Sequence, residues 1–246
     1  MRCSPLPALL GGLLYLAATP AFAQSDSCPN TRELAARVEM SPGTPLRLKA
    51  GAGSLAVRGV DGLREARMRG TVCATSAELA QQASVTTVRE AGAVVVETVM
   101  PDVQDRFMNN DFVRIDLIVE VPLGTPATVH DGSGSAELGN LGDLEVHDGS
   151  GDLHIENIGG RLEVHDGSGG LEIRRTGGPV QVHDGSGELV ITDAGGDVTI
   201  HDGSGSIDVD GVRGNLVVSE DGSGSVDYAN VAGRVDVPRR GRGRHR

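Results

Sequence analysis

The pentapeptide His-Asp-Gly-Ser-Gly carries the side chains of this sequence that could do chemistry. Five copies begin at regular intervals along the C-terminal half, at His130, His147, His165, His183 and His201. Their aspartates follow directly, at Asp131, Asp148, Asp166, Asp184 and Asp202, and a sixth copy has Glu220 in place of histidine. Imidazole and carboxylate groups are good ligands for zinc, nickel and copper, so the repeat suggests a metal-binding ladder built from these residues.

A metal site in such a ladder makes a geometric demand. If the copies stack in register, neighbouring histidines lie about 4.8 Å apart, the spacing of adjacent β-strands. Zinc needs its nitrogen ligands at about 2.0–2.1 Å, so two imidazoles would have to lean together. Calcium is the weaker hypothesis. The repeat resembles the calcium-binding β-roll with its unit GGxGxDxUx, but here the aspartate precedes the glycines.

The same pentapeptide is also suited to a corner of the chain, and this interpretation needs no cofactor. Aspartate can bond backbone N–H groups two residues ahead, and glycine adopts positive φ without steric penalty. Serines stacked in register can hydrogen-bond along the ladder, while the histidine covers the outward side of the strand end. We favour this interpretation over metal binding.

A third interpretation is a pH response of the histidines. Two protonated imidazoles one coil apart repel each other by about 1 kcal/mol in water. This repulsion lowers the proton affinity of the column, while the nearby aspartates act in the opposite direction. The sequence therefore predicts that stability changes in mild acid.

Histidine, aspartate and serine within one motif also raise the question of a hydrolase, which we reject. A catalytic triad requires one pocket, converging side chains and a preorganised oxyanion site. The same three residues repeated along a convex corner provide none of these, and the short coils leave no inserted loops to shape a cleft. We predict that the protein is not an enzyme and has no catalytic residues.

The elements that position the motif are short strands. Each unit reads HDGSG-x-L-x-I-x-x-x-GG-x-L-x-V, in which two stretches of alternating apolar and polar residues are separated by glycine-rich corners. No unit can bury its apolar face alone, whereas stacked units can. We therefore predict an all-β fold over residues 126–238, a parallel β-solenoid with two strands in each coil of about 18 residues.

Residues 24–125 are predicted to be mostly β, and either to continue the solenoid or to pack on its end as a cap. The segment PLRLKAGAGSLAVR, residues 45–58, has the pattern of an imperfect early coil. Between this coil and the later strands, Thr75-x-x-Glu78 is a capping pattern and predicts a short helix through Gln82. Further strands are expected at 84–88, 93–99 and 112–121.

Residues 1–23 have the features of a signal peptide. Arg2 is followed by an apolar run from Leu6 to Ala18 and then by Ala21-Phe22-Ala23, a small-x-small cleavage pattern. We expect export to the periplasm, the cell surface or the medium, with no transmembrane segment in the mature chain. In an exported chain the two remaining cysteines, Cys28 and Cys73, are expected to form a disulfide.

Charge is unevenly distributed along the chain. The formal net charge is −12, although residues 239–246 carry five arginines. An acidic body repels phosphate, so we expect no nucleic acid partner. The basic tail is either a solvated, flexible terminus or a contact to an anionic surface such as lipid headgroups or polyanionic glycans.

Three segments in a fixed order resemble the bacterial putative-adhesin domain family, a family of unknown function. They are GAGSLAV at 51–57, RIDLIVEVPLGTPATV at 114–129 and the tandem GSG-x-L-x-I coils. The resemblance implies a β-solenoid at the cell envelope without known catalytic residues, and the His-Asp pair departs from it. We therefore expect a non-catalytic interaction or scaffold module that binds a glycan or an envelope protein, with a metal-binding ladder as the alternative.

Overall fold

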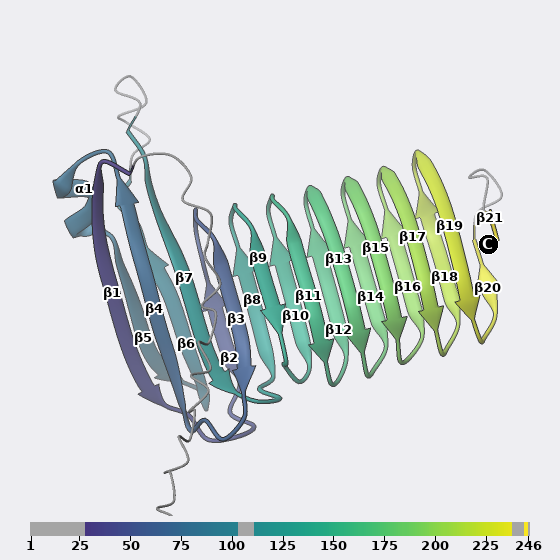
Figure 1. Cartoon of the computed structure of the whole chain (residues 1–246), viewed down its shortest axis with the longest axis horizontal. Coiled ribbons are helices and arrows are strands. Elements are labelled where there is room, and N and C mark those ends of the chain that lie inside the picture. Colours follow the sequence, from purple (N-terminus) through teal and green to yellow (C-terminus); the bar gives the residue numbers. More distant parts are fainter. Residues whose placement is uncertain (1–27, 103–110, 238–243, 246) are drawn as a thin grey trace, which may run out of the picture.

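The computed structural model of the chain describes residues 28–102, 111–237 and 244–245. The predicted signal peptide, Pro238 and most of the basic tail lie outside the described residues. Two β-sheets face each other along the whole molecule and form a flattened rod (Figure 1). Within the described residues, no helix has the length and apolar character needed to cross a membrane.

The repeats form a parallel β-solenoid with two strands in each coil, as predicted. One sheet contains β9 (Ala136–Gly139), β11 (Leu153–Ile158), β13 (Gly169–Thr176), β15 (Gly187–Ala194), β17 (Gly205–Val212), β19 (Gly224–Val231) and β21 (Arg244–His245). The other sheet contains β8 (Ala127–Asp131), β10 (Leu144–Asp148), β12 (Leu162–Asp166), β14 (Val180–Asp184), β16 (Val198–Asp202), β18 (Leu216–Asp221) and β20 (Val235–Asp236).

The apolar columns expected from the repeat make up the core between the sheets. Leu153, Leu171 and Leu189 pair in register on successive strands and are almost completely buried. Burial of a side chain of this size stabilises the fold by about 1.5–3 kcal/mol, and the same contribution recurs at each coil. Repetition of one small apolar pattern therefore suffices to hold the rod together.

One longer repeat is accommodated by a β-bulge. The aspartates of the fifth and sixth copies are 19 residues apart, one more than in the three preceding coils. The pairing of β16 with β18 shifts between Ile200 and His201, so that His201 lies opposite Glu220 and Ser219 is the extra residue. The bulge keeps the apolar columns in register on both sides of the insertion.

The N-terminal cap, which consists of β1 to β7 and α1, extends both sheets beyond the repeats. The predicted early coil is present as β2 (Leu46–Lys49) and β3 (Leu55–Val60), which pair in parallel with β8 and β9. Beyond this coil, β7 (Val113–Pro122), β4 (Glu65–Ala74) and β1 (Asn30–Glu39) extend the first sheet, and β6 (Ala93–Val99) and β5 (Ser84–Glu90) extend the second. The pairs β1–β4, β4–β7 and β5–β6 are antiparallel, and β1 and β4 had no counterpart in the sequence prediction.

The short helix of the cap, α1 (Ala77–Gln82), begins one residue later than the capping pattern predicts. Its N-cap is Ser76, whose side chain accepts a hydrogen bond from the Leu79 N–H at 3.2 Å. The prediction that Thr75 caps the helix is wrong, because the Thr75 hydroxyl instead donates to Asp111 Oδ1 at 2.9 Å. Thr75 and Ser76 are adjacent and both could cap the helix. The contact of Thr75 with Asp111 leaves Ser76 as the N-cap.

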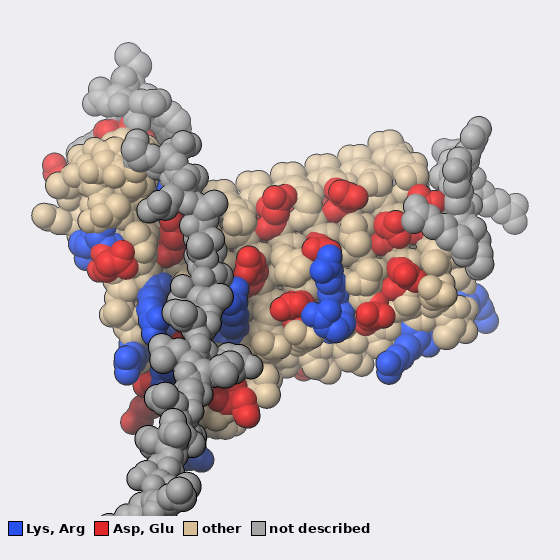
Figure 2. Space-filling model, in the orientation of Figure 1, with Lys and Arg blue, Asp and Glu red and all other residues tan. Residues whose placement is uncertain are grey.

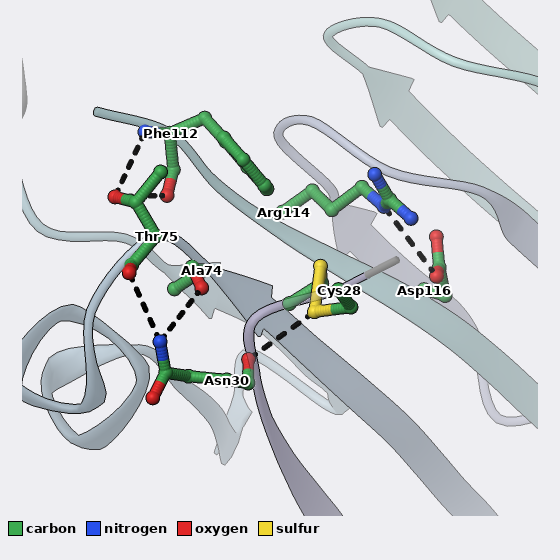
Figure 3. The surroundings of a disulfide bond; sticks show 8 residues. Cys28, Asn30, Ala74, Thr75, Phe112, Arg114 and Asp116 are labelled. Atoms are coloured by element: carbon green, nitrogen blue, oxygen red, sulfur yellow. Dashed lines mark hydrogen bonds and ion pairs between the residues drawn. A yellow bond between two sulfur atoms is a disulfide. The ribbon is translucent and has the colours of Figure 1, made fainter. Parts of the chain in front are cut away.

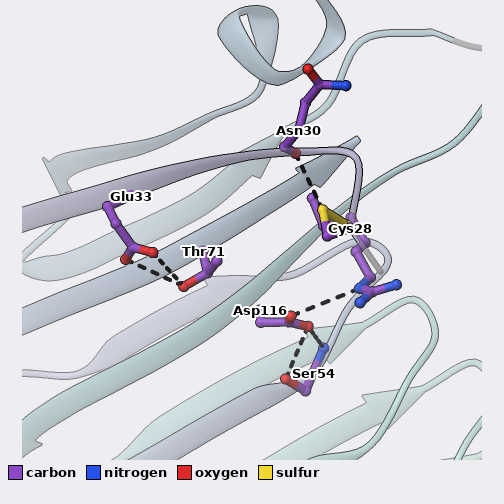
Figure 4. A network of polar contacts seen from close by, with 8 residues as sticks. Cys28, Asn30, Glu33, Ser54, Thr71 and Asp116 are labelled. Carbon is purple, nitrogen blue, oxygen red and sulfur yellow. Dashed lines mark hydrogen bonds and ion pairs between the residues drawn. A yellow bond between two sulfur atoms is a disulfide. The ribbon is translucent and has the colours of Figure 1, made fainter. Parts of the chain in front are cut away.

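A disulfide joins Cys28 and Cys73, as predicted, and fastens the start of β1 to β4 (Figure 3). Close by, the Asn30 side-chain amide donates to the Thr75 carbonyl at 2.9 Å. Further along the sheet, the Thr71 hydroxyl donates to Glu33 at 3.2 Å, and the Ser54 N–H donates to Asp116 at 2.9 Å (Figure 4). The strands of the cap are thus connected by individual polar contacts that do not recur from strand to strand.

Candidate functional site: the histidine ladder

The five repeated histidines form one continuous outward-facing stack, here called the histidine ladder. Each histidine is the second-last residue of its strand, in β8, β10, β12, β14 or β16. In-register pairing places His147 opposite His165, and the other neighbours likewise. Successive ring centroids lie 4.6–4.8 Å apart with interplanar angles of 4–9°. The strand register alone therefore produces a regular row of imidazoles.

The repeated aspartates form a second column, the aspartate ladder, on the inner side of the same strands. Successive side chains of a strand point to opposite faces, so each aspartate turns inward where its histidine turns outward. The exposed fraction of the five aspartates is only 2–6%. The predicted corner bonds are present, because Asp184 and Asp202 each accept a hydrogen bond at 3.0 Å from the N–H of the serine two residues ahead.

The outward rings have polar neighbours on the same sheet. His147 Nε2 lies 3.0 Å from Glu145 Oε1, and the equivalent atoms of His165 and Glu163 are 3.2 Å apart. At the bulge, His201 Nδ1 lies 2.7 Å from the Ser219 hydroxyl. The Nε2 atoms of His147 and His165 thus point toward the middle of their strands, away from the glycine corner.

An open groove of about 540 Å³ runs along the ladder across four coils. It is lined by the histidine and aspartate of each coil and, in three of them, by the glycine that follows, Gly167, Gly185 and Gly203. These glycines are exposed, and without a side chain they leave the backbone bare beside the imidazoles. The groove offers the same environment at every coil, which favours an extended ligand with a repeat of its own.

The two ladders do not converge on a metal site. Within the residues that the structure describes, no group of three His, Cys, Asp or Glu side chains comes together in a way that could hold a metal ion. Parallel rings place their nitrogens side by side, and the carboxyl groups lie on the other side of the sheet. Binding of zinc, nickel or calcium by the repeated histidines and aspartates stays a prediction, and the geometry identifies no metal ligand.

The titrating groups of the two ladders respond to their surroundings in different ways. Partial burial, with the nearby charges of His147 and Lys49, lowers the pKa of His130. Burial raises the pKa of Asp131 and Asp166 to about 7 and that of Asp184 to about 6, with neighbouring carboxylates adding to the effect. A pH response was expected of the histidines only. Strict alternation along each strand is the sequence signal that could have shown that the aspartates point inward.

The opposite sheet carries a more varied surface. His154 lies 2.8 Å from Glu172 there, between Nδ1 and Oε2, and is not part of the ladder. Figure 2 shows acidic side chains spread along the repeats on the face in view, with few basic ones among them. This distribution agrees with the acidic composition and offers no continuous basic strip on that face.

Comparisons with known proteins find similarity only at the level of solved structures. No protein-family model matches the sequence, and no curated protein matches it. A putative cell adhesion protein from Clostridium sporogenes is 14% identical, with 88% of this chain and 100% of that chain covered and a TM-score of 0.31. A putative lipid binding protein from Parabacteroides distasonis is 12% identical, with 87% and 95% covered and a TM-score of 0.42. A putative adhesin from Bacteroides fragilis is 10% identical, with 88% and 96% covered and a TM-score of 0.37.

Proposed function

We propose that the protein is a non-catalytic, adhesin-like interaction module that binds an extended glycan along the histidine-lined groove. The observation that carries this proposal is the groove itself, in which stacked imidazoles recur every 4.6–4.8 Å beside exposed glycine backbone. A polymer with repeating hydroxyl or carboxylate groups can make the same contact at several coils. Each contact is weak, but several on one chain add up through effective concentration.

Imidazole suits such a ligand because its two ring nitrogens can donate or accept hydrogen bonds. Stacking covers the ring faces, so the ring edges are what the ligand would meet. The groove repeats one set of groups and lacks the converging nucleophile, base and oxyanion donors that acyl transfer requires. We infer binding without turnover for this reason.

Export to the cell envelope is part of the same proposal. Disulfides persist in oxidising compartments such as the periplasm and the cell surface, and Cys28 and Cys73 form one. The N-terminal sequence pattern of a signal peptide points the same way. A glycan partner is accessible in either place.

The test is binding of the mature protein, residues 24–246, to a panel of immobilised bacterial polysaccharides in the presence of a chelator. We expect retention on at least one acidic or neutral polysaccharide, with loss of most binding when all five ladder histidines are changed to asparagine. His154→Asn is the matched control, since it removes a histidine from the opposite sheet and should leave binding intact. Equal retention of the five-fold variant, or capture of an envelope protein in place of any glycan, would overturn the proposal.

The same variants distinguish metal binding by the ladder from glycan binding. Ring nitrogens of five stacked imidazoles lie on the outside of one sheet, which is the observation in its favour. Thermal unfolding with chelator would be compared with added zinc, nickel or calcium. A metal-specific rise in Tm of several degrees that disappears in the five-fold variant would favour the metal ladder.

A further inference from the structure

The aspartate ladder is a row of buried carboxyl groups that the proposed glycan contact does not use. Asp131, Asp148, Asp166, Asp184 and Asp202 occupy one position on successive coils, and their strands pair in register. Their side chains point into the corner of the solenoid and are 94% or more buried. Strand spacing places neighbouring carboxyl groups about 4.8 Å apart.

Several oxygens of this ladder have no hydrogen-bond donor. No oxygen of Asp148 or Asp166 accepts a well-formed hydrogen bond, although the N–H groups of the corner residues after each aspartate lie nearby, and Oδ2 of Asp131 and Asp184 has no partner. An ionised carboxylate loses several kcal/mol when it is buried without partners, and like charges on adjacent coils add repulsion. A ladder in which all rungs are ionised is therefore strongly unfavourable.

A proton on one carboxyl group removes both difficulties at once. It cancels one charge, and the resulting O–H can donate to the unpartnered oxygen of the next rung. Asparagine would provide the same rung-to-rung bond at any pH through its amide N–H groups. The chain has aspartate at all of these positions, so the bond depends on protons from solution.

We propose that the aspartate ladder is a proton-binding column, in which rungs protonated in mild acid donate hydrogen bonds to the carboxyl groups of neighbouring coils and stabilise the solenoid. Loss of these protons as the pH rises weakens the stack from within. The device is independent of any ligand in the outer groove.

The pKa shifts set the sign and the pH range of the effect. A pKa raised to about 7 in Asp131 and Asp166, and to about 6 in Asp184, means that the folded chain holds protons that the unfolded chain has already released. The ladder's contribution to stability is fully present below the unfolded pKa of about 4. It is lost as the pH rises through about 6 to 7.

Other charged groups around the ladder do not reverse this sign. On the outer side of the same sheet are the histidine ladder and, on β2, Lys49. The pKa of His130 is lowered, so protonation of His130 destabilises the fold in acid, an effect of opposite sign to that of the aspartates. Across the corner, Asp152 and Glu188 lie at the start of β11 and β15 and are exposed. At the N-terminal end the Gly132 N–H donates to the carbonyl of Ala50, which carries no charge. A fall in stability with rising pH would therefore come from the aspartates.

The experiment measures the Tm of the mature protein between pH 4 and pH 8.5, with a chelator throughout. We expect the wild-type Tm to fall by at least about 5 °C between pH 5 and pH 8. The double variant Asp148→Asn/Asp166→Asn keeps the corner acceptors and gains amide donors. It should show a flatter profile and a higher Tm than the wild type at pH 8.

The double variant Asp152→Asn/Asp193→Asn is the matched control, because it removes the same charge from two exposed positions of the repeats. It should keep the wild-type slope. A wild-type Tm that is constant or rises between pH 5 and pH 8, or an interior variant that keeps the full slope, would overturn the proposal. If the interior double variant does not fold, carbon NMR of the wild-type carboxyl groups decides: titration near pH 6–7 supports the column, and titration of all of them near pH 4 refutes it.

Discussion

The N-terminal cap and the repeats share the same two sheets, but different kinds of interaction hold them together. In the repeats, each coil pairs in parallel with its neighbour and contributes the same few side chains to the core. In the cap, outer strands pair antiparallel, a helix covers part of the end, and a disulfide joins β1 to β4. Regular repetition stabilises a stack of any length, whereas its end needs unique contacts.

The difference follows from what a solenoid lacks at its ends. A terminal coil exposes unpaired backbone groups and one side of the apolar core. The cap ends the parallel stack with strands that pair antiparallel, namely β1, β4 and β5. Larger side chains such as Met40, Met68 and Leu79 are buried there. Changes in the cap should therefore act locally, and changes in the repeats should act along the ladder.

The largest expected effect comes from the disulfide of the cap. Cys28→Ser/Cys73→Ser opens a link between residues 45 positions apart, which should cost about 4 kcal/mol of unfolding free energy. Hydrogen exchange should show lost protection in β1 and β4, while β12 to β16 stay protected. Reduced wild-type protein is the control and should match the variant. Equal loss of protection in cap and repeats would show that the two regions form a single cooperative unit.

The next largest effect concerns a glycine corner of the repeats. Gly169 has φ of +136°, and a Cβ at this position would lie 1.7 Å from the carbonyl oxygen of Gly151 on the neighbouring coil. Gly169→Ala should cost about 3 kcal/mol or more, through backbone strain and forced separation of two coils. Urea unfolding would measure it.

Gly62 of the cap is the matched comparison. Its φ is +72°, but nothing lies within 4 Å of the position a Cβ would take. Gly62→Ala should therefore cost only the backbone strain, about 1–2 kcal/mol. Equal costs at the two positions would show that close stacking of coils, the feature that distinguishes the repeats, adds nothing.

The repeats were predictable from sequence to a degree that the cap was not. The spacing of the pentapeptide and the alternation around it are enough to predict the strands, their register and the apolar columns. Strand β1 has the sequence NTRELAARVE, whose Glu, Leu, Ala and Arg are good helix formers, and only its pairing with β4 makes it extended. Single contacts such as this leave no periodic signal.

The candidate site shows the same division. The stacked histidines were predicted from the spacing of the repeat. The inward position of the aspartates was not predicted, although alternation along each strand implies it. The groove was not predicted either, because it depends on which outward positions lack a side chain and on how the rings turn toward Glu145 and Glu163. The unpartnered carboxyl oxygens also required coordinates, since they depend on what surrounds the corner.

A smaller effect is expected where cap and repeats meet. His130 pairs with Lys49 of the cap on one side and stacks on His147 on the other. Because its pKa is lowered, the folded chain binds a proton here less readily than the unfolded chain, and stability is lost as the pH falls below about 6.5. His130→Asn should therefore raise the unfolding free energy at pH 5.5 and change it less at pH 8. Because the ring is exposed and solvent screens its charge, the gain should stay below about 1 kcal/mol.

His154→Asn serves as the control for this junction, since its ring lies beside the Glu172 carboxylate on the opposite sheet. Urea unfolding of both variants at the two pH values would measure the difference. A gain at pH 5.5 in both, or in neither, would show that charge repulsion at the junction of cap and repeats does not affect stability.

The smallest expected effect compares one backbone feature in both regions. Arg175 at a corner of the repeats and Ala91 in the β5–β6 hairpin of the cap have φ of 55° and 50°. Neighbouring coils have Asn157 and Asp193 at the position of Arg175, residue types that tolerate this conformation. Ala91→Asn creates the Asn-Gly sequence favoured in two-residue hairpins and should stabilise the fold by about 0.5–1 kcal/mol.

Arg175→Asn should give a smaller gain, although it relieves the same strain. The arginine donates to Asn157 Oδ1 at 2.7 Å and to Glu156 Oε2 at 2.6 Å, and the variant loses these contacts to the preceding coil. Exposed pairs of this kind contribute about 0–1 kcal/mol, which offsets part of the relief. Chemical unfolding of both variants would measure the two gains. A gain for Arg175→Asn equal to that for Ala91→Asn would mean that side-chain contacts between coils contribute nothing, and that the backbone ladder and the core alone hold the repeats together.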